Sequence, residues 1–193
     1  IEEIKEKVDV KIFKRKAASM FRQNLLNELK GLEREEAYDF FNDKVGEIIS
    51  ARVIAKNDKF ITFDLGKGIS ATMSYHDALP NEEYTIGDVK KVYLSKVEKT
   101  TKGPRVYISR SNKEIVKKLF EMYIPEISSG LIEIMGISRE PGSRTKIGVL
   151  SVNGDIDPKG ACVGNGGSRI KAINEVLCGE KIEMENKEQK NKQ

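Results

Sequence analysis

The fold of this chain is decided by residues 157–170, which read Asp-Pro-Lys-Gly-Ala-Cys-Val-Gly-Asn-Gly-Gly-Ser-Arg-Ile. Asp157 is a favourable helix N-cap and Pro158 suits the first helical position, so a short helix is expected to begin here. The glycines of residues 164–167 then break that helix. Apolar side chains return at helical spacing, which predicts a second helix with one buried face; they are Ile170, Ile173 and Leu177.

The glycine run brings backbone N–H groups to the start of the second helix, where two basic side chains add positive charge. Free N–H groups at a helix N-terminus suit an anion, most simply a phosphate. We therefore predict an anion-binding site at Gly164, Asn165, Gly166, Gly167, Arg169 and Lys171. The alternative is a plain turn between two packed helices, because such turns are common.

The surroundings of the glycines exclude two other phosphate loops. A dinucleotide fingerprint requires Gly-x-Gly-x-x-Gly directly after a strand, and a Walker loop requires Gly-Lys followed by Ser or Thr. Here the glycines lie between two expected helices, and no Gly-Lys-Ser or Gly-Lys-Thr follows them.

The elements expected around the glycine turn occur in a recognisable order. Residues 112–123 form a charged helix, and residues 131–138 and 145–152 are apolar runs joined by a Pro-Gly turn. Residues 181–185 alternate apolar and charged side chains as a third short strand. The order helix, strand, strand, helix, Gly-x-x-Gly, helix, strand resembles the bacterial (type II) KH domain. The glycine loop of a KH domain clamps about four nucleotides of single-stranded nucleic acid.

Three longer motifs narrow this resemblance. They are Arg-Glu-Pro-Gly-Ser-Arg at 139–144, Ile-Asp-Pro-Lys-Gly-Ala-Cys-Val-Gly at 156–164 and Cys-Gly-Glu-Lys-Ile at 178–182. Together they resemble the first KH domain of the NusA family of bacterial transcription elongation and termination factors. That family usually has a basic residue at the second variable loop position, where this chain has Gly166. The resemblance implies that the glycine turn binds RNA, with Arg144 and Lys146 as further contacts.

Residues 44–111 are expected to form a small OB barrel, since five short apolar runs are separated by Gly and Asn turns. The expected strands are 46–56, 60–65, 69–75, 90–97 and 105–109. The patterns Val-Gly-Glu-Ile at 45–48 and Phe-Asp-Leu-Gly at 63–66 resemble the OB domain named after the largest protein of the small ribosomal subunit. That family binds single-stranded RNA, usually by stacking bases on exposed aromatic side chains.

Strand alternation predicts which barrel side chains face the core. The inward set is Ile61, Phe63, Leu65, Ala71, Met73 and Tyr75, and the outward set is Phe60, Thr62, Thr72, Ser74 and His76. The stacking positions of the family fall on Lys59, Thr62 and Ser74, none of them aromatic, although Phe60 and His76 could substitute. Residues 44–111 carry 12 basic and 8 acidic side chains, which favours a polyanionic partner. The barrel is therefore expected to contribute charge and little stacking, chiefly through Lys59, Lys90 and Lys91, with Lys96, Lys99, Lys102 and Arg105.

The first 43 residues are expected to be mostly helical. Residues 8–12 alternate like a remnant strand, and residues 17–41 read as one long helix. Its leucines are expected to pack on neighbouring elements; they are Leu25, Leu26, Leu29 and Leu32. By resemblance, residues 1–43 are the end of a polymerase-binding domain and its connecting helix. Residues 186–193 are polar and are expected to be a disordered tail.

Composition limits the remaining possibilities. The chain has 193 residues, 38% hydrophobic and 33% charged, with no apolar run long enough for a membrane span. It starts at Ile1 without a signal peptide, so we expect a cytoplasmic piece of a longer protein. Cys162 and Cys178 are expected to be reduced and buried, as small apolar residues in a reducing compartment. One histidine and two cysteines do not make a zinc site, and no cofactor is expected.

The sequence thus predicts an α+β protein: a helical N-terminal segment, a five-stranded OB-type barrel at 44–111 and a type II KH domain at 112–185. We expect a monomeric, non-catalytic RNA-binding module. By resemblance, its partners are nascent single-stranded RNA and RNA polymerase, the latter mainly through the N-terminal domain, and its role is in pausing, termination and antitermination.

One alternative is the accessory region of a phosphorolytic exoribonuclease, although there the KH domain precedes the OB barrel. The only histidine, His76, lies in a barrel connection without a nucleophile–base partner. Another alternative is a structural spacer between flanking domains.

Overall fold

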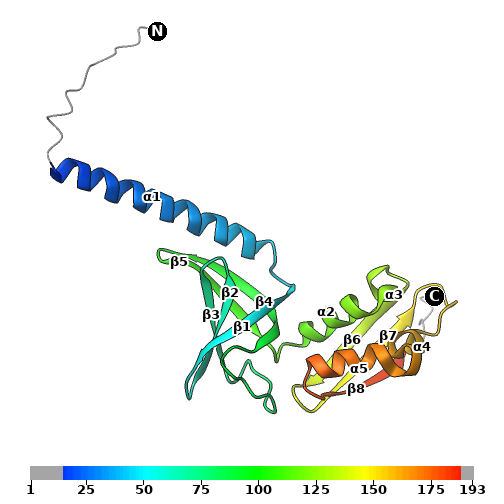
Figure 1. Ribbon diagram of the computed structural model, residues 1–193. Coiled ribbons are helices and arrows are strands. Elements are labelled where there is room, and N and C mark those ends of the chain that lie inside the picture. Colours follow the sequence, from blue (N-terminus) through cyan, green and yellow to red (C-terminus); the bar gives the residue numbers. More distant parts are fainter. Residues whose placement is uncertain (1–14, 188–193) are drawn as a thin grey trace, which may run out of the picture.

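The computed structural model describes residues 15–187, and the expected strand at residues 8–12 lies outside this range. A long helix leads into a β-barrel, and the barrel is followed by a three-stranded sheet covered by helices (Figure 1). We call residues 44–111 the barrel and residues 112–187 the KH unit. No helix between residues 15 and 187 combines the length and apolar character needed to cross a membrane.

The predicted N-terminal helix is confirmed as α1, Arg15–Asn42. Only its C-terminal part meets the barrel, where Ala37 and Phe41 are buried and Phe41 joins the barrel core. The rest of α1 projects beyond the barrel (Figure 1). The expectation that the helix leucines pack on neighbouring elements is therefore wrong. Their exposed fractions run from 42% to 64%, for Leu25, Leu26, Leu29 and Leu32.

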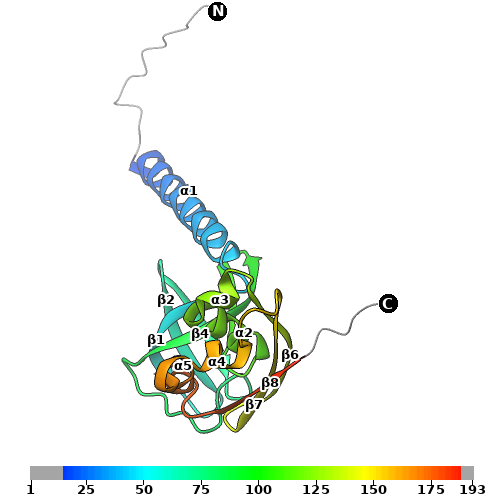
Figure 2. The ribbon, with the colours of Figure 1, turned by 90° about the vertical axis from the view of Figure 1, so that its right-hand side faces the viewer.

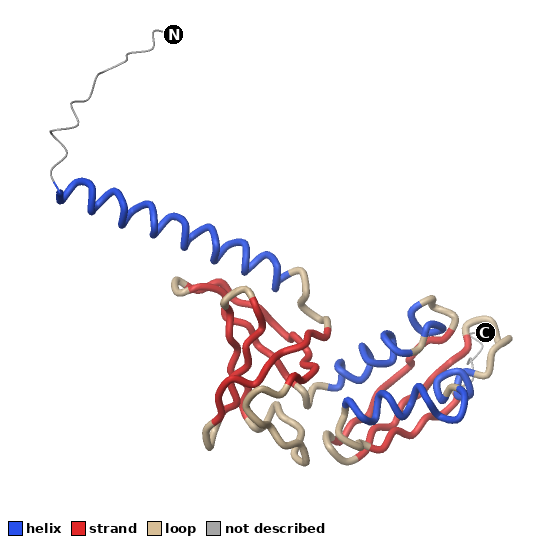
Figure 3. The backbone as a smooth tube through the Cα atoms, viewed as in Figure 1, coloured by secondary structure: helices blue, strands red, loops and turns tan. Residues whose placement is uncertain are grey.

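All five predicted barrel strands are present, and all neighbouring pairs are antiparallel. Their order in the sheet is β3-β2-β1-β4-β5, and β3 also contacts β5, so the barrel is nearly closed (Figure 3). The strands are β1 Ile48–Lys56, β2 Phe60–Gly66, β3 Ile69–Ser74, β4 Val89–Thr100 and β5 Gly103–Ser109.

The alternation in the barrel is confirmed for most of the inward set. Ile61, Phe63, Ala71 and Met73 are buried, and Leu65 packs against the same core. Tyr75, however, is 44% exposed, so its inward assignment is wrong. The physical reason is a turn that begins where β3 ends. Ser74 Oγ donates to Asp77 Oδ2 at 2.9 Å and the Asp77 N–H donates to the Ser74 carbonyl at 3.0 Å, so the chain leaves the strand direction before Tyr75.

The KH unit has the predicted element order, with two short additions: helix α3, and a 3-10 helix, η2 Asn165–Gly167, between α4 and α5. Its elements are α2 Lys113–Tyr123, α3 Pro125–Ser128, β6 Ile132–Glu140, β7 Arg144–Ser151, α4 Pro158–Val163, α5 Ser168–Val176 and β8 Lys181–Asn186. The sheet order is β6-β7-β8, with β6 antiparallel and β8 parallel to β7. The helices lie together on one face of this sheet (Figure 2). Its core is closed by apolar side chains from α2, β7 and α5, such as Phe120, Val149 and Ile173.

The two cysteines are both free, but they differ in environment. Cys162 of α4 is buried as predicted, and its burial raises the pKa of the thiol to about 11. Cys178 is exposed, so the expectation of burial is wrong for this residue. It follows the end of α5 with a positive φ of 56°, in the turn that leads to β8. That turn lies at the surface facing the barrel, not in the core.

Candidate nucleic-acid interface

The helix before the glycine turn is capped as the sequence predicts. Asp157 accepts backbone hydrogen bonds from Lys159 at 3.2 Å and from Gly160 at 3.1 Å, and Pro158 occupies the first turn of α4. A Cβ on Gly160 would lie 2.5 Å from Asp157 Oδ2. A residue with a side chain at this position would therefore require the Asp157 carboxylate to shift.

Two backbone donors of the turn have no acceptor in the part of the chain that the structure describes. Gly164 donates to the Gly160 carbonyl and Gly167 donates to the Gly164 carbonyl, at 3.0 and 3.1 Å. Within residues 15–187, the N–H groups of Asn165 and Gly166 have no such acceptor. They lie immediately before α5, whose N-terminus adds the partial positive charge of its dipole. Two free donors and a helix N-terminus make this turn suited to a phosphate oxygen.

Positive φ angles at the three glycines shape the turn. Their values are 73° for Gly164, 61° for Gly166 and 77° for Gly167. Gly164 combines its φ with a ψ of 175°, a region that is essentially restricted to glycine. Gly166 has open space around it, and a Cβ at this position would meet nothing within 4 Å. The substitution of Gly166 is therefore limited by backbone conformation alone, whereas Gly164 is limited by conformation and by contact.

Lys171 lies beside the turn, and its side chain has no partner within residues 15–187. Its Cε is 3.7 Å from the position that a Cβ on Gly167 would take. Lys171 makes no ion pair or hydrogen bond through its side chain among the residues that the structure describes. Its ammonium group is therefore available to a ligand at the turn.

Arg169 is held differently, although the sequence placed it in the same site. Its Nη1 donates to Glu126 Oε2 and to the Ala161 carbonyl, both at 2.7 Å. The pKa of Glu126 is lowered by a hydrogen bond from the Glu126 backbone N–H, and the hydrogen bond from Arg169 lowers it further. The charge of Arg169 is thus matched by a carboxylate within the KH unit.

The KH unit offers aliphatic rather than aromatic contacts beside the turn. Ala161 of α4 and Ile170 of α5 are only partly buried, and Ile170 Cγ2 is 3.9 Å from a Cβ position on Gly167. The aromatic residues of the KH unit are Phe120, which is buried, and Tyr123, whose hydroxyl accepts from Lys91 Nζ. Bases next to the turn would meet aliphatic side chains.

The structure does not bring Arg144 and Lys146 to the glycine turn. They alternate along β7 with the buried Thr145 and Ile147, which face the helices. Arg144 and Lys146 therefore project from the opposite, helix-free face of the sheet. Lys146 is opposite Glu183 in the β7–β8 register.

The three barrel lysines of the predicted site do not form one free surface. Lys59 is exposed in the turn between β1 and β2. Lys90 Nζ lies 3.3 Å from Glu82 Oε1, and Lys91 Nζ donates to the Tyr123 hydroxyl at 2.8 Å. Lys90 and Lys91 are consecutive strand residues, so they point to opposite sides of the strand. Both are engaged where the barrel meets the KH unit, which sequence alternation alone did not reveal.

Sequence reasoning missed the residues that join the barrel to the KH unit. Arg110, which follows β5, is 1% exposed and donates to Glu82 Oε1 at 2.8 Å and to the Val176 carbonyl at 2.7 Å. Cys178 Sγ lies 3.2 Å from the same Glu82 oxygen. Burial acts to raise the pKa of Glu82, but the Arg110 guanidinium and neighbouring hydrogen bonds hold it below its usual value.

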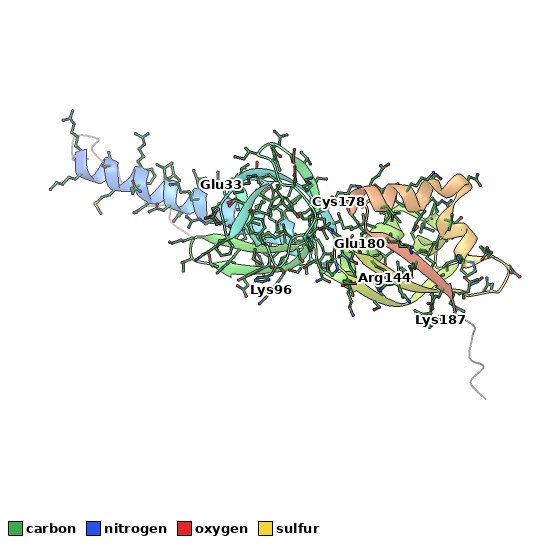
Figure 4. All side chains as sticks on the ribbon, turned by 90° about the horizontal axis from the view of Figure 1, so that it is seen from below. Glu33, Lys96, Arg144, Cys178, Glu180 and Lys187 are labelled. Atoms are coloured by element: carbon green, nitrogen blue, oxygen red, sulfur yellow. The ribbon has the colours of Figure 1, made fainter. Side chains whose placement is uncertain are left out.

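A second buried ion pair continues this junction into the KH unit. Arg139 donates to both carboxylate oxygens of Glu180 at 2.9 Å. Its Nη1 also donates to the backbone carbonyls of Arg110 and Asn112, at 2.9 and 2.7 Å. Cys178 and Glu180 lie at the end of the KH unit that faces the barrel (Figure 4). Arg139 and Glu180 lie in two of the longer sequence motifs, 139–144 and 178–182. Membership of these motifs was the only feature of the sequence that pointed to the two residues.

A nearly closed five-stranded barrel followed by a KH unit with a donor-bearing Gly-x-x-Gly turn is typical of proteins that bind single-stranded nucleic acid. Comparison with known families agrees for the KH unit. Residues 110–186 match the family described as the NusA-like first KH domain.

Curated relatives extend the match to most of the chain. This chain is 42% identical to the transcription termination/antitermination protein NusA of Bacillus subtilis (strain 168), over 93% of its own length and 48% of the relative. It is 38% identical to NusA of Thermus thermophilus, over 88% and 44%, and 35% identical to NusA of Rickettsia conorii, over 88% and 34%. The chain spans a little under half the length of the Bacillus subtilis and Thermus thermophilus relatives. It corresponds to part of a NusA protein.

Proposed function

We propose that this chain is the RNA-binding part of a NusA-type transcription factor. In this role it binds nascent single-stranded RNA and acts with RNA polymerase, in the cytoplasm, to modulate pausing, termination and antitermination. The names of the relatives and the KH family match support this proposal. The observation that carries RNA binding is the pair of N–H groups at Asn165 and Gly166 that lack an acceptor within residues 15–187, next to the start of α5 and Lys171.

The proposed binding mode follows from the chemistry of the turn. A phosphate oxygen accepts from the two free N–H groups, and the α5 dipole and the Lys171 ammonium group stabilise its negative charge. Bases adjoining that phosphate lie against the aliphatic side chains of Ala161 and Ile170. Because backbone donors to phosphate do not read base identity, the turn positions the strand and contributes little sequence preference.

The proposed role is binding, not catalysis. The relatives are named as transcription proteins, which favours this role over an exoribonuclease accessory region. A spacer role would give no reason for two free donors beside a lysine that has no partner in the described part of the chain.

The direct test places a negative charge at the turn. Asn165 does not have a positive φ, so Asn165→Asp introduces charge without the backbone strain expected at Gly166. We expect short single-stranded RNA to bind about tenfold more weakly, since about 1.4 kcal/mol of repulsion produces that change. Fluorescence anisotropy measures the affinity, and circular dichroism checks that the variant is folded.

The matched control is Asn27→Asp, which makes the same charge change at an exposed position on α1. It should leave RNA affinity within about twofold of the wild type, because a charge beyond a Debye length of about 10 Å is largely screened. Wild-type affinity in a folded Asn165→Asp protein would reject the turn as the RNA site.

A further inference from the structure

We propose that Arg169 is a positioning residue for RNA binding, which holds the glycine turn in its binding conformation, and that Lys171 makes the phosphate contact. The inference rests on the proposed RNA-binding function of the turn. The sequence analysis placed Arg169 and Lys171 together in the anion-binding site. The inference instead gives them two different roles.

The first argument is the contact between Arg169 and Gly164. A Cβ on Gly164 would lie 2.8 Å from Arg169 Cγ and 3.0 Å from its Cδ, so the arginine methylenes pack directly on this glycine. Gly164 has a φ of 73° and a ψ of 175°, a conformation that is open to glycine but not to residues with a Cβ. Because a glycine can leave this conformation easily, the packing of Arg169 against it restricts the turn.

The second argument is the set of groups that the Arg169 guanidinium joins. Its hydrogen bond to the Ala161 carbonyl satisfies an acceptor in the last turn of α4, where helix carbonyls lack intrahelical partners. Its ion pair with Glu126 ties the same guanidinium to α3. Arg169 therefore connects α3, the end of α4, Gly164 and the start of α5. A phosphate contact through Nη1 would require Arg169 to leave these partners.

The third argument is helix geometry. Residues two apart on an α-helix are separated by about 200° around its axis, so their side chains leave on nearly opposite sides. Arg169 is directed to α3 and α4, and Lys171 lies over Gly167. The two side chains therefore do not converge on one phosphate, and Lys171 is the one without a partner among the described residues.

The test is the salt dependence of binding to a short single-stranded RNA, measured for Arg169→Ala and Lys171→Ala. Each phosphate contact contributes about 0.7 to the slope of log affinity against log salt for single strands. Lys171→Ala is expected to flatten the slope by about that amount. Arg169→Ala is expected to weaken binding about tenfold at every salt concentration and to leave the slope unchanged. A flattened slope in Arg169→Ala would overturn the inference.

Amide hydrogen exchange provides a readout that is independent of RNA. In Arg169→Ala, the hydrogen-bonded amides of Gly164 and Gly167 should exchange faster, while the buried Ile173 amide should retain its protection. Equal acceleration at Ile173 would mean that Arg169 only supports global stability, and would overturn the positioning role. Circular dichroism identifies a temperature at which each variant is folded, and the exchange is measured there.

Glu126 variants test the same inference without altering Arg169. Glu126→Gln keeps a hydrogen-bond acceptor and should bind RNA within about twofold of the wild type, whereas Glu126→Ala should bind several-fold more weakly. If Arg169 instead contacts phosphate in competition with Glu126, then Glu126→Ala will bind more tightly with a steeper salt slope. Tighter or unchanged binding would overturn the inference.

The two proposals fail in distinguishable ways. Absence of an Asn165→Asp effect, in a folded protein, rejects RNA binding at the turn. A clear Asn165→Asp effect combined with a flattened slope in Arg169→Ala keeps the RNA site and rejects only the positioning role. The Glu126→Ala result decides the inference even where Arg169→Ala does not fold.

Discussion

The glycine turn and the barrel–KH junction differ in how their polar groups are paired. At the turn, the N–H groups of Asn165 and Gly166 lack internal acceptors within the described residues. At the junction, Arg110 donates to Glu82 and to the Val176 carbonyl while almost wholly buried. A polar group that is exposed and unpaired can be completed by a ligand, whereas a buried one must be completed by the protein itself. The difference separates a surface that we propose to bind RNA from one that fixes geometry.

Apolar packing reinforces the junction. Ile48 of β1 and Tyr93 of β4 pack against the core of the KH unit, although both belong to the barrel. On the polar side, Asn81 donates to the Gly142 carbonyl at 3.0 Å and Lys118 pairs with Glu47 at 2.9 Å. The barrel and the KH unit are thus joined by shared core contacts as well as by ion pairs.

The largest expected effect comes from removing the buried cation of the junction. Arg110→Ala leaves Glu82 buried without its main partner, and both side chains are 1% exposed in the wild type. Losing one partner of a buried pair costs about 3–5 kcal/mol, so we expect the free energy of unfolding to fall by that amount. Urea denaturation measures it.

The matched control for Arg110→Ala is Lys96→Ala, which removes one partner of the exposed Lys96–Glu98 pair. An exposed pair contributes at most about 1 kcal/mol. If both variants lose the same stability, then burial of the junction pair does not matter and the comparison with an open surface fails.

Acid should weaken the junction. The folded-state pKa values of Glu82 and Glu180 are below the ordinary glutamate value. Each carboxylate therefore stabilises the fold above its unfolded-state pKa, and that contribution is lost as pH falls through the folded-state pKa. We expect unfolding free energy to decrease on acidification from the ordinary glutamate range downward. Urea titrations at a series of pH values should show a shallower decrease in Glu82→Gln, and an identical pH profile would contradict the assignment.

Within the turn, alanine should be far worse at Gly164 than at Gly166. Gly164→Ala introduces a Cβ 2.8 Å from Arg169 Cγ at a glycine-only conformation, which costs about 1–3 kcal/mol for the backbone alone. Gly166 has a φ of 61° and free space, so Gly166→Ala meets only the left-handed penalty of about 1–2 kcal/mol. RNA titration and denaturation of both variants would measure this, and equal losses would show that the Arg169 contact is unimportant.

The smallest expected effect is at the edge of the junction. Tyr123→Phe removes the hydroxyl that accepts from Lys91 Nζ at 2.8 Å while leaving the ring in place. A single hydrogen bond contributes about 0.5–1.5 kcal/mol, so the free energy of unfolding should fall within that range. Thermal unfolding followed by circular dichroism is sufficient to detect it. A loss as large as that of Arg110→Ala would mean that the Lys91 contact, and not the buried pair, dominates the junction.

The sequence by itself determined the elements and the chemistry of the turn. Alternation located the five barrel strands, and the Asp157 cap, the glycines and the spacing of Ile170, Ile173 and Leu177 located both helices around the turn. These signals are local, because capping, strand alternation and helical periodicity are properties of neighbouring residues.

Only the tertiary structure decided which charges are free. Arg169 and Lys171 look equivalent in the sequence, yet Glu126, 43 residues from Arg169, neutralises one of them. Lys90 and Lys91 are likewise engaged by Glu82 and Tyr123, and α1 keeps its leucines exposed because its N-terminal part extends beyond the barrel. The partner of a long charged side chain comes from a segment far away in the chain. The residues next to that side chain in the sequence therefore do not predict its partner.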